Sequence, residues 1–174
     1  MRERTIKSKR IFSGRLLGLR DDTVRLETGK ISRREICEHP GAVAVVAVTG
    51  KKEIVLIRQF RKPAERVLLE IPAGLFNKGE SLAAAAKREL AEETGYTARK
   101  IKKVFSAYMS PGYSTEVLHY FFASGLELSA QHYEEDEDIR VEVMPIARAM
   151  RMVKKGQVRD NKTIVGILIT QWMS

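Results

Sequence analysis

The sequence predicts an α/β protein: a mixed sheet with helices on its faces, preceded by a small antiparallel β appendage. An unbroken apolar run at residues 42–48, AVAVVAV, is typical of a strand buried on both faces. Residues 81–94 place Leu82, Ala85, Ala86 and Leu90 at helical spacing on one face. Strands precede this helix, further strands follow it, and two helical segments end the chain, an order that favours helices packed on a mixed sheet.

The N-terminal part reads as three short strands that end at the chain break His39-Pro40-Gly41. A turn signal at residues 28–30 predicts a hairpin between the second and third strands. Three short strands bury little surface alone, so we expect residues 1–39 to pack on the main domain, residues 40–174, or on a partner subunit. The expected strands cover residues 10–17, 23–27 and 31–37.

In the main domain, residues 61–66 are expected to form a loop and residues 124–138 a polar connection. Ser81 is suited to cap the start of the central helix, and Gly95 suits the left-handed position after its end. Asp160 is suited to cap the last helix. Further strands are expected at 53–60, 67–71, 102–109, 116–123 and 139–144, and helices at 145–153 and 162–172.

Composition narrows the possible classes of protein. A chain of 174 residues with 44% hydrophobic residues is long enough for one ordinary core. A single cysteine, Cys37, excludes an internal disulfide and suits a reducing compartment. The longest apolar run is too short to cross a bilayer, so we expect a cytoplasmic protein with no membrane partner.

The net charge of +9 raises the question of nucleic-acid binding. Residues 1–40 carry 11 Lys and Arg against 6 Asp and Glu, and the other basic residues are scattered without interleaved aromatics. A positive field that attracts small anionic nucleotides explains the same charge. A nucleic-acid partner is therefore not expected.

The central helix carries more carboxylates than its stability favours. Glu89, Glu92 and Glu93 share one turn near the helix C-terminus, where the macrodipole disfavours anions. Oxygen ligands at this spacing suit Mg²⁺ or Mn²⁺, and Arg88 can hold Glu92 by a charge-assisted hydrogen bond. A solvated helix with ordinary salt bridges is the alternative for such a pattern.

The spacing around this helix is far more specific than a pair of glutamates. The chain fits the frame G-x5-E-x7-R-E-U-x-E-E-x-G-U, where U is a bulky apolar residue, and resembles the signature box of the Nudix hydrolases. Tyr96 stands at the last U, where an aliphatic residue is usual. The residues that match the fixed positions are Gly74, Glu80, Arg88, Glu89, Glu92, Glu93 and Gly95.

Segments outside the box are similar to the ADP-ribose pyrophosphatase branch of that family. They include VLIRQFRKP, LLEIPAG and MSPGYSTE, and Pro111 follows Tyr96 by fifteen residues, a distance that marks ADP-ribose hydrolysis. The resemblance implies an α/β/α sandwich and a homodimer whose N-terminal strands exchange between subunits. It also implies Mg²⁺-dependent hydrolysis of ADP-ribose to AMP and ribose 5-phosphate.

The resemblance also implies roles for single residues. Glu89, Glu93 and the Ala73 carbonyl would bind metal with Glu92 beside them, and Arg88 would orient a box glutamate. Gly74, Glu80 and Gly95 would maintain the geometry of the motif, although Glu80 could instead bind an extra metal. The matched substrate-binding residues are Arg34, Arg61, Pro111, Gly112 and Glu116.

Two questions stay open from the sequence. The general base is either a box glutamate, Glu92 or Glu93, or Glu137 in the acidic run before residue 139, which resembles a loop that supplies the base in some members of the branch. The substrate could be another nucleotide sugar, a dinucleotide cofactor or a capped RNA end. A non-catalytic nucleotide-binding module is disfavoured because such a module has no need of the box carboxylates.

Overall fold

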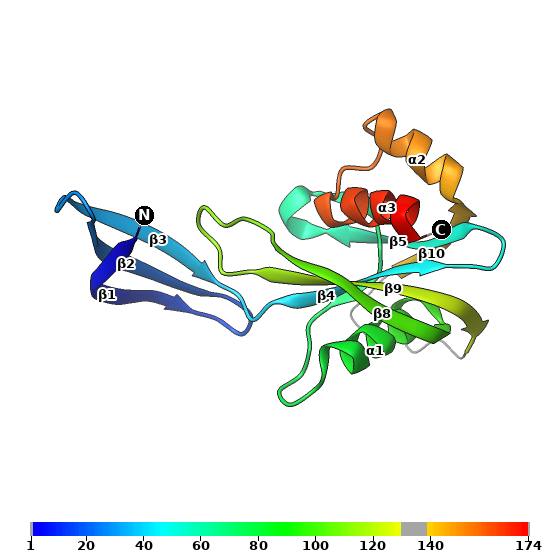
Figure 1. Cartoon of the computed structure of the whole chain (residues 1–174), viewed down its shortest axis with the longest axis horizontal. Coiled ribbons are helices and arrows are strands. Elements are labelled where there is room, and N and C mark those ends of the chain that lie inside the picture. Colours follow the sequence, from blue (N-terminus) through cyan, green and yellow to red (C-terminus); the bar gives the residue numbers. More distant parts are fainter. Residues whose placement is uncertain (1, 130–138, 174) are drawn as a thin grey trace. The chain divides into compact units, whose positions relative to one another are not determined.

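The computed structural model describes residues 2–129 and 139–173, and the chain divides into two compact units (Figure 1). The first unit contains the residues up to Ala42 together with Ser106–Leu118. The second contains Val43–Phe105 and the residues from His119 onward. Two separate stretches of sequence therefore build each unit.

The first unit contains a three-stranded antiparallel sheet in the order β1-β2-β3. The predicted hairpin turn is confirmed between β2 and β3: the Leu26 amide donates to the Lys30 carbonyl at 2.9 Å, and Gly29 has a φ of 82°. A positive φ of this size favours glycine, which explains the residue at the turn. The strands are β1 (Glu3–Ser13), β2 (Gly18–Leu26) and β3 (Ile31–Glu38).

The predictions of a first strand at residues 10–17 and a second at residues 23–27 were wrong in their bounds, and β2 already begins at Gly18. β1 begins at Glu3, and the chain already reverses after Ser13, where the Gly14 amide donates to the Leu17 carbonyl at 2.8 Å. Every residue of β1 is exposed, so no alternation of apolar and polar residues marks the strand in the sequence. Backbone pairing with β2 defines it instead.

The second unit contains most of a sheet in the order β10-β5-β4-β9-β8, with β6 beside β5 and β7 beside β4; only Ala42 and the parts of β8 and β9 within Ser106–Leu118 belong to the first unit. Its strands are β4 (Ala42–Val48), β5 (Glu53–Arg61), β6 (Arg66–Glu70), β7 (Ala73–Gly74), β8 (Tyr96–Tyr108), β9 (Val117–Leu128) and β10 (Ile139–Pro145). Its helices are a 3-10 turn η1 (Lys62–Ala64), α1 (Leu82–Thr94), α2 (Ile146–Lys154) and α3 (Asn161–Met173). Of the helices that the structure describes, none is long and apolar enough to cross a membrane.

Strand β4 lies at the centre of the core because both of its faces are covered. One face packs against α1, and the other lies against α3, which Figure 1 shows on the opposite side of the sheet. A Cβ at Gly166 of α3 would meet the side chains of Ile71 and Val46, so the missing side chain lets the helix approach closely. The α1 side of the core contains Val43, Val45, Ala47, Ala85, Ala86 and Leu90. This arrangement confirms the predicted α/β sandwich.

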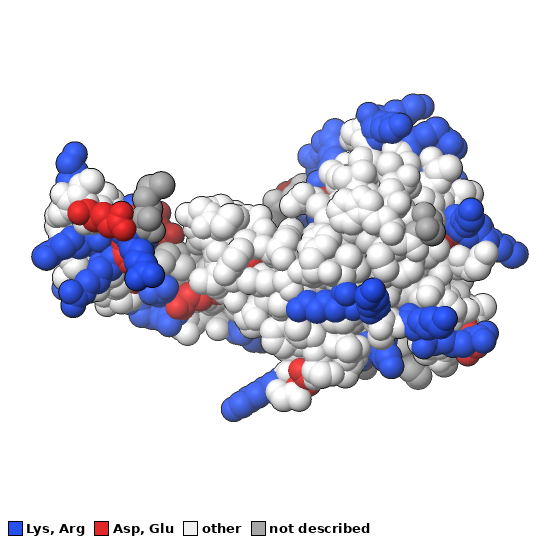
Figure 2. Space-filling view, in the orientation of Figure 1, with Lys and Arg blue, Asp and Glu red and all other residues white. Residues whose placement is uncertain are grey.

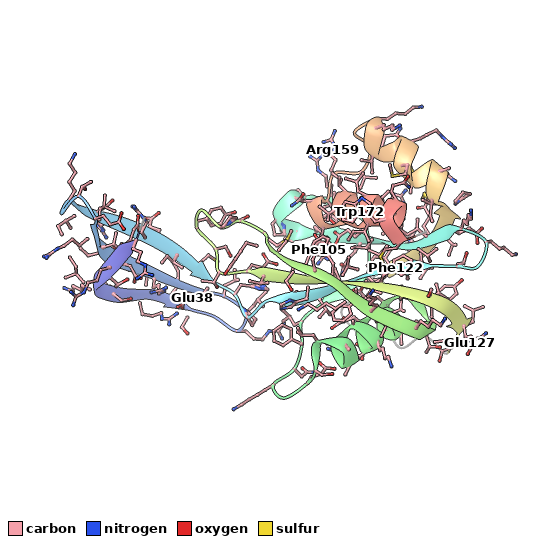
Figure 3. All side chains as sticks on the ribbon, viewed as in Figure 1. Glu38, Phe105, Phe122, Glu127, Arg159 and Trp172 are labelled. Atoms are coloured by element: carbon pink, nitrogen blue, oxygen red, sulfur yellow. The ribbon has the colours of Figure 1, made fainter. Side chains whose placement is uncertain are left out.

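The C-terminal turn of α3 also packs on the sheet. Trp172 lies with its ring centroid 6.5 Å from that of Phe105, both labelled in Figure 3. Phe105 in turn contacts Tyr120 of β9 at 4.9 Å between centroids. Aromatic pairs at these separations add to the stabilisation from burial.

Three element predictions need correction. β8 begins at Tyr96 rather than at residue 102, and β9 continues to Leu128 through residues predicted to be a polar connection. Neither extension contains an unbroken apolar run: Thr97, Arg99 and Lys100 interrupt the first, and Gly125 and Glu127 interrupt the second. The predicted loop at 61–66 contains η1, and the rest of the predicted connection, residues 130–138, lies outside the described residues.

The cap of α1 gives a test of the local fold. The Ser81 hydroxyl accepts a hydrogen bond from the Ala84 amide at 3.2 Å. Ser81→Ala should lower the free energy of unfolding by about 1 kcal/mol, because this amide loses its partner. Urea denaturation measures the change. Ser81→Asp keeps an acceptor and should stay near the wild-type value; equal losses in both variants would contradict the capping role.

Candidate active site

Helix α1 begins and ends where the sequence predicts. Ser81 caps its start, and Gly95 adopts the left-handed conformation with a φ of 71° while its amide donates to the Ala91 carbonyl at 2.9 Å. The helix buries one face in the core and carries Glu89 and Glu93 on the buried side, at 9% and 4% exposure. Two buried carboxylates at i and i+4 need compensation by cations or hydrogen-bond donors.

Arg88 supplies much of that compensation within the helix region. Its Nε donates to Glu80 at 3.0 Å, and its Nη1 donates to Glu89 at 2.7 Å and to Glu92 at 2.8 Å. Its Nη2 donates to Glu80 at 3.0 Å and to the Leu75 carbonyl at 2.8 Å. One guanidinium therefore ties the loop before α1 to two carboxylates on the helix.

The ion pairs change the acidity of both partners. The bond from Arg88, followed by the bond from the Asn77 amide, lowers the pKa of the Glu80 carboxyl. The carboxylate of Glu80, followed by those of Glu89 and Glu92, raises the pKa of Arg88 even though burial opposes the charge. Arg88 and Glu80 therefore stay charged over the physiological range.

Gly74 and Ala73 of β7 complete the arrangement. An ideal Cβ at Gly74 would occupy the space of the Glu89 carboxylate, so any other residue at position 74 would displace that side chain. The Ala73 amide donates to a Glu93 carboxylate oxygen at 2.9 Å. The β7 backbone and α1 thus hold Glu89 and Glu93 at defined positions.

These groups fit the chemistry of Mg²⁺ or Mn²⁺. The oxygen donors are carboxylates, and Mg²⁺ prefers one or two carboxylates together with substrate phosphates. Gly74 leaves room for the carboxylate of Glu89, and Ala73 contacts Glu93. Among residues 2–129 and 139–173, no three His, Cys, Asp or Glu side chains converge into a ready-made cage. A divalent ion held by Glu89 and Glu93 would keep coordination positions for substrate oxygens.

Arg61 belongs to a second charge network, which the sequence did not predict. Its Nε and Nη2 donate to the two oxygens of Glu70 at 2.8 and 2.7 Å, and Lys162 of α3 also donates to Glu70. Burial would raise the pKa of the Glu70 carboxyl, but the bonds from Arg61 and Lys162 outweigh it, and the pKa lies below its usual value. The pKa of Arg61 is raised by Glu70 and, to a smaller extent, by the charges of Glu93 and Asp160.

The start of α3 holds this network in place. Asp160 accepts from the Thr163 amide at 2.9 Å, which confirms the predicted cap of the last helix. The Thr163 hydroxyl accepts from the Ile71 amide at 2.8 Å, next to Glu70. The sequence contained one sign of this network: Glu70 lies within the apolar segment VLLEI. A carboxylate in a buried strand requires a cation nearby.

The remaining candidates are the predicted substrate-binding residues of the first unit and Glu137, which lies outside the residues that the structure describes. Arg34 of β3 donates to both carboxylate oxygens of Glu3, at 3.0 and 2.5 Å. Pro111 and Gly112 are exposed in a turn where the Ser114 amide donates to the Ser110 carbonyl at 2.8 Å, and the Glu116 carbonyl accepts from the Met109 amide at 3.1 Å. Glu137, a candidate general base, lies outside the described residues.

The fold and the box define a member of a known family. The model of the NUDIX domain matches residues 38–165, and the chain belongs to the Nudix family. The chain is 46% identical over 173 residues to the ADP-ribose pyrophosphatase of Bacillus subtilis (strain 168), covering 98% of this chain and 94% of that protein. The predicted relationship to the ADP-ribose pyrophosphatase branch of the Nudix hydrolases is thereby confirmed.

Other relatives carry different names. The chain is 41% identical to a methanol dehydrogenase activator of Bacillus methanolicus, covering 97% of this chain and 92% of that protein. It is 35% identical to a GDP-mannose pyrophosphatase of Salmonella arizonae, over 92% of this chain and 91% of that protein. The crystal structure of an ADP compounds hydrolase superposes with a TM-score of 0.88 over 99% of this chain and 95% of the other, at 22% identity, which supports the fold.

The carboxylate of Glu70 gives a stability test. Glu70→Gln keeps the shape of the side chain but leaves Arg61 without its charged partner and Lys162 with Asp160 alone, which should cost about 1–3 kcal/mol. Glu127→Gln, which breaks an exposed pair with Arg99, should cost less than about 1 kcal/mol. Denaturant titration at neutral pH measures both free energies of unfolding.

The interaction of Glu70 with Arg61 and Lys162 also predicts that stability depends on pH. Because the folded-state pKa of Glu70 lies below the unfolded value of about 4.3, the folded protein binds fewer protons at this site. Its contribution is complete above the unfolded pKa and is lost as pH falls through the folded pKa. The free energy of unfolding of Glu70→Gln should therefore fall less than that of the wild type between neutral and acidic pH. Parallel pH profiles would contradict this account.

Proposed function

We propose that this chain catalyses the hydrolysis of ADP-ribose by water to AMP and ribose 5-phosphate, with Mg²⁺ as cofactor. The observation that carries the proposal is an intact Nudix box on α1, with Arg88, Glu80, Glu89 and Glu92 in contact, in a chain 46% identical to a named ADP-ribose pyrophosphatase. Related ADP-sugars belong to the same proposal. A cytoplasmic location remains a prediction from the composition.

The proposed chemistry assigns a task to each part of the site. Glu89, Glu93 and the Ala73 carbonyl would hold Mg²⁺, with Glu92 beside them. When bound there, the metal would act as a Lewis acid that neutralises negative charge on the pyrophosphate and makes an attacking water more acidic. Arg88 keeps Glu89 and Glu92 in position, and Arg61, fixed by Glu70, would contact the phosphates through its planar guanidinium.

The remaining substrate contacts are proposed from the resemblance. Arg34, Pro111, Gly112 and Glu116 would bind the substrate, and Arg34 can exchange its bonds with Glu3 for bonds to a bound anion. GDP-mannose is the second candidate substrate, because GDP-mannose pyrophosphatases are 35% identical over most of the chain. Both candidates contain a pyrophosphate linked to a sugar, so the same metal site serves either.

A substrate panel with a matched variant tests the proposal. Phosphate release from ADP-ribose, GDP-mannose and UDP-glucose, coupled to an added phosphatase, should be fastest for ADP-ribose and should stop when EDTA removes the metal. Glu93→Gln should lose roughly 10²-fold or more in turnover at low Mg²⁺ while it remains folded, since it removes a metal ligand. Lys87→Gln, an exposed change on the same helix, is the control. Wild-type turnover in Glu93→Gln would refute the assignment of Glu93 as a metal ligand. Faster hydrolysis of GDP-mannose than of ADP-ribose would identify GDP-mannose as the preferred substrate.

The general base is proposed among three carboxylates, Glu92, Glu93 and Glu137. If Glu137 is the base, Glu137→Gln should lower kcat by roughly 10²–10⁴-fold with little change in metal affinity. Glu134→Gln and Glu135→Gln, in the same acidic run, should retain wild-type kcat. Equal kcat in all three variants would exclude Glu137 and leave Glu92 or Glu93.

We also propose that the protein is a homodimer in which residues 1–39 contact the partner subunit. Seven apolar side chains between residues 2 and 39 are more than one third exposed, and apolar side chains gathered on a surface are typical of a contact with another chain. They are Ile6, Ile11, Phe12, Leu16, Leu17, Leu19 and Ile31. A dimer would bury part of this surface.

Sedimentation velocity measures the oligomeric state directly. The wild type should sediment as a dimer at micromolar concentration, and Phe12→Asp should shift it toward the monomer by placing a charge on the apolar surface. Leu128→Asp, at a still more exposed apolar position in the second unit, should remain dimeric. A wild-type monomer would reject the proposed exchange.

A further inference from the structure

A cavity of about 680 Å³ lies in the second unit, on the side of the sheet opposite α1. Helix α2, the last turn of α3 and the turn between β4 and β5 form its walls. It contains none of the residues assigned to the active site. Its lining residues are Val48, Lys51, Lys52, Phe122, Pro145, Ile146, Ala147, Met150, Arg151, Lys154, Thr170, Gln171 and Met173.

The alternation of side chains along the strands explains the apolar floor. On β9, Phe121 and Ala123 pack in the core against α1, so Phe122, labelled in Figure 3, lies on the opposite face. On β4, Val48 shares its face with Val46, which lies against α3. Met150 and Met173 add flexible apolar side chains that adapt to ligands of different shape.

Four cations surround this apolar floor, and no carboxylate is among the lining residues. Lys51 and Lys52 come from the β4–β5 turn, and Arg151 and Lys154 come from the last turn of α2. Figure 2 shows basic side chains gathered over both elements. None of the four forms an ion pair with another of the residues that the structure describes.

Helix stability alone does not explain these charges. Cations at the C-terminus of α2 are favoured by its dipole, which accounts for Arg151 and Lys154. Lys51 and Lys52 come from the β4–β5 turn, where the Lys52 carbonyl accepts from the Ile146 amide at 3.1 Å, so they lie near the N-terminus of α2, where the dipole disfavours cations. Their presence at the edge of the same cavity points to an anionic group near its opening.

We propose that this cavity binds a small organic anion with an apolar body, such as a medium-chain carboxylate. The apolar part would contact Phe122, Ile146 and Met150, and the charged group would lie among the four cations. A volume of about 680 Å³ falls within the range of small-ligand sites. A protein partner would instead need about 800 Å² of matching surface on each side. The proposal is independent of the proposed catalytic function.

Titration calorimetry with decanoate below its micelle concentration tests the site. EDTA is included so that the carboxylate cannot bind through a metal held by α1. We expect one decanoate per chain, bound about tenfold or more tighter than decyltrimethylammonium, a difference of about 1.4 kcal/mol. Equal binding of both probes, or no binding of decanoate at millimolar concentration, would overturn the proposal.

Two variants locate the site. Ala147→Trp places a large side chain at an exposed lining position, and it should weaken decanoate binding about tenfold by filling the cavity. Lys51→Glu combined with Arg151→Glu reverses two charges at the opening and should weaken it by a similar or larger factor. Arg148→Glu, an exposed change on α2 outside the lining, should stay within about twofold. If the first two variants, shown by circular dichroism to be folded, bind as well as the wild type, decanoate binds elsewhere and the proposal is wrong.

Discussion

The candidate active site depends on the guanidinium of Arg88. Its five donated hydrogen bonds join Glu80 and the Leu75 carbonyl, which precede α1, to Glu89 and Glu92 on the helix. Without this cation, the carboxylates on one helical turn repel one another near the end of the helix that already disfavours anions. Arg88 therefore makes an otherwise unfavourable concentration of negative charge compatible with a folded helix.

The sheet imposes the second constraint on the site. Its strands β7 and β6 hold charged side chains of α1 and α3 in fixed positions. Gly74 leaves space for the Glu89 carboxylate, and the Ala73 amide holds Glu93. On the α3 side, Glu70 at the end of β6 binds Arg61 and Lys162. The charge of Glu93 also raises the pKa of Arg61, so a proposed metal ligand and the proposed phosphate-binding arginine influence each other electrostatically.

The structural features that depend on local sequence were predictable. The caps Ser81 and Gly95, the buried strand at 42–48 and the spacing of the box each follow from a few neighbouring residues. The Glu70 network was missed because its partners are 9 and 92 residues away in sequence. β1 was misplaced because a fully exposed strand shows no apolar alternation, and the cavity beside α2 depends on packing between distant elements.

Manganese binding measured by electron paramagnetic resonance tests the central role of Arg88 most directly. Arg88→Lys keeps the positive charge but loses the planar fork that contacts three carboxylates at once. We expect the affinity of the protein for Mn²⁺ to fall about 10–100-fold, as is typical when a residue that orients metal ligands is changed, with the helix content by circular dichroism preserved. Wild-type Mn²⁺ affinity in Arg88→Lys would show that Arg88 does not organise the metal site.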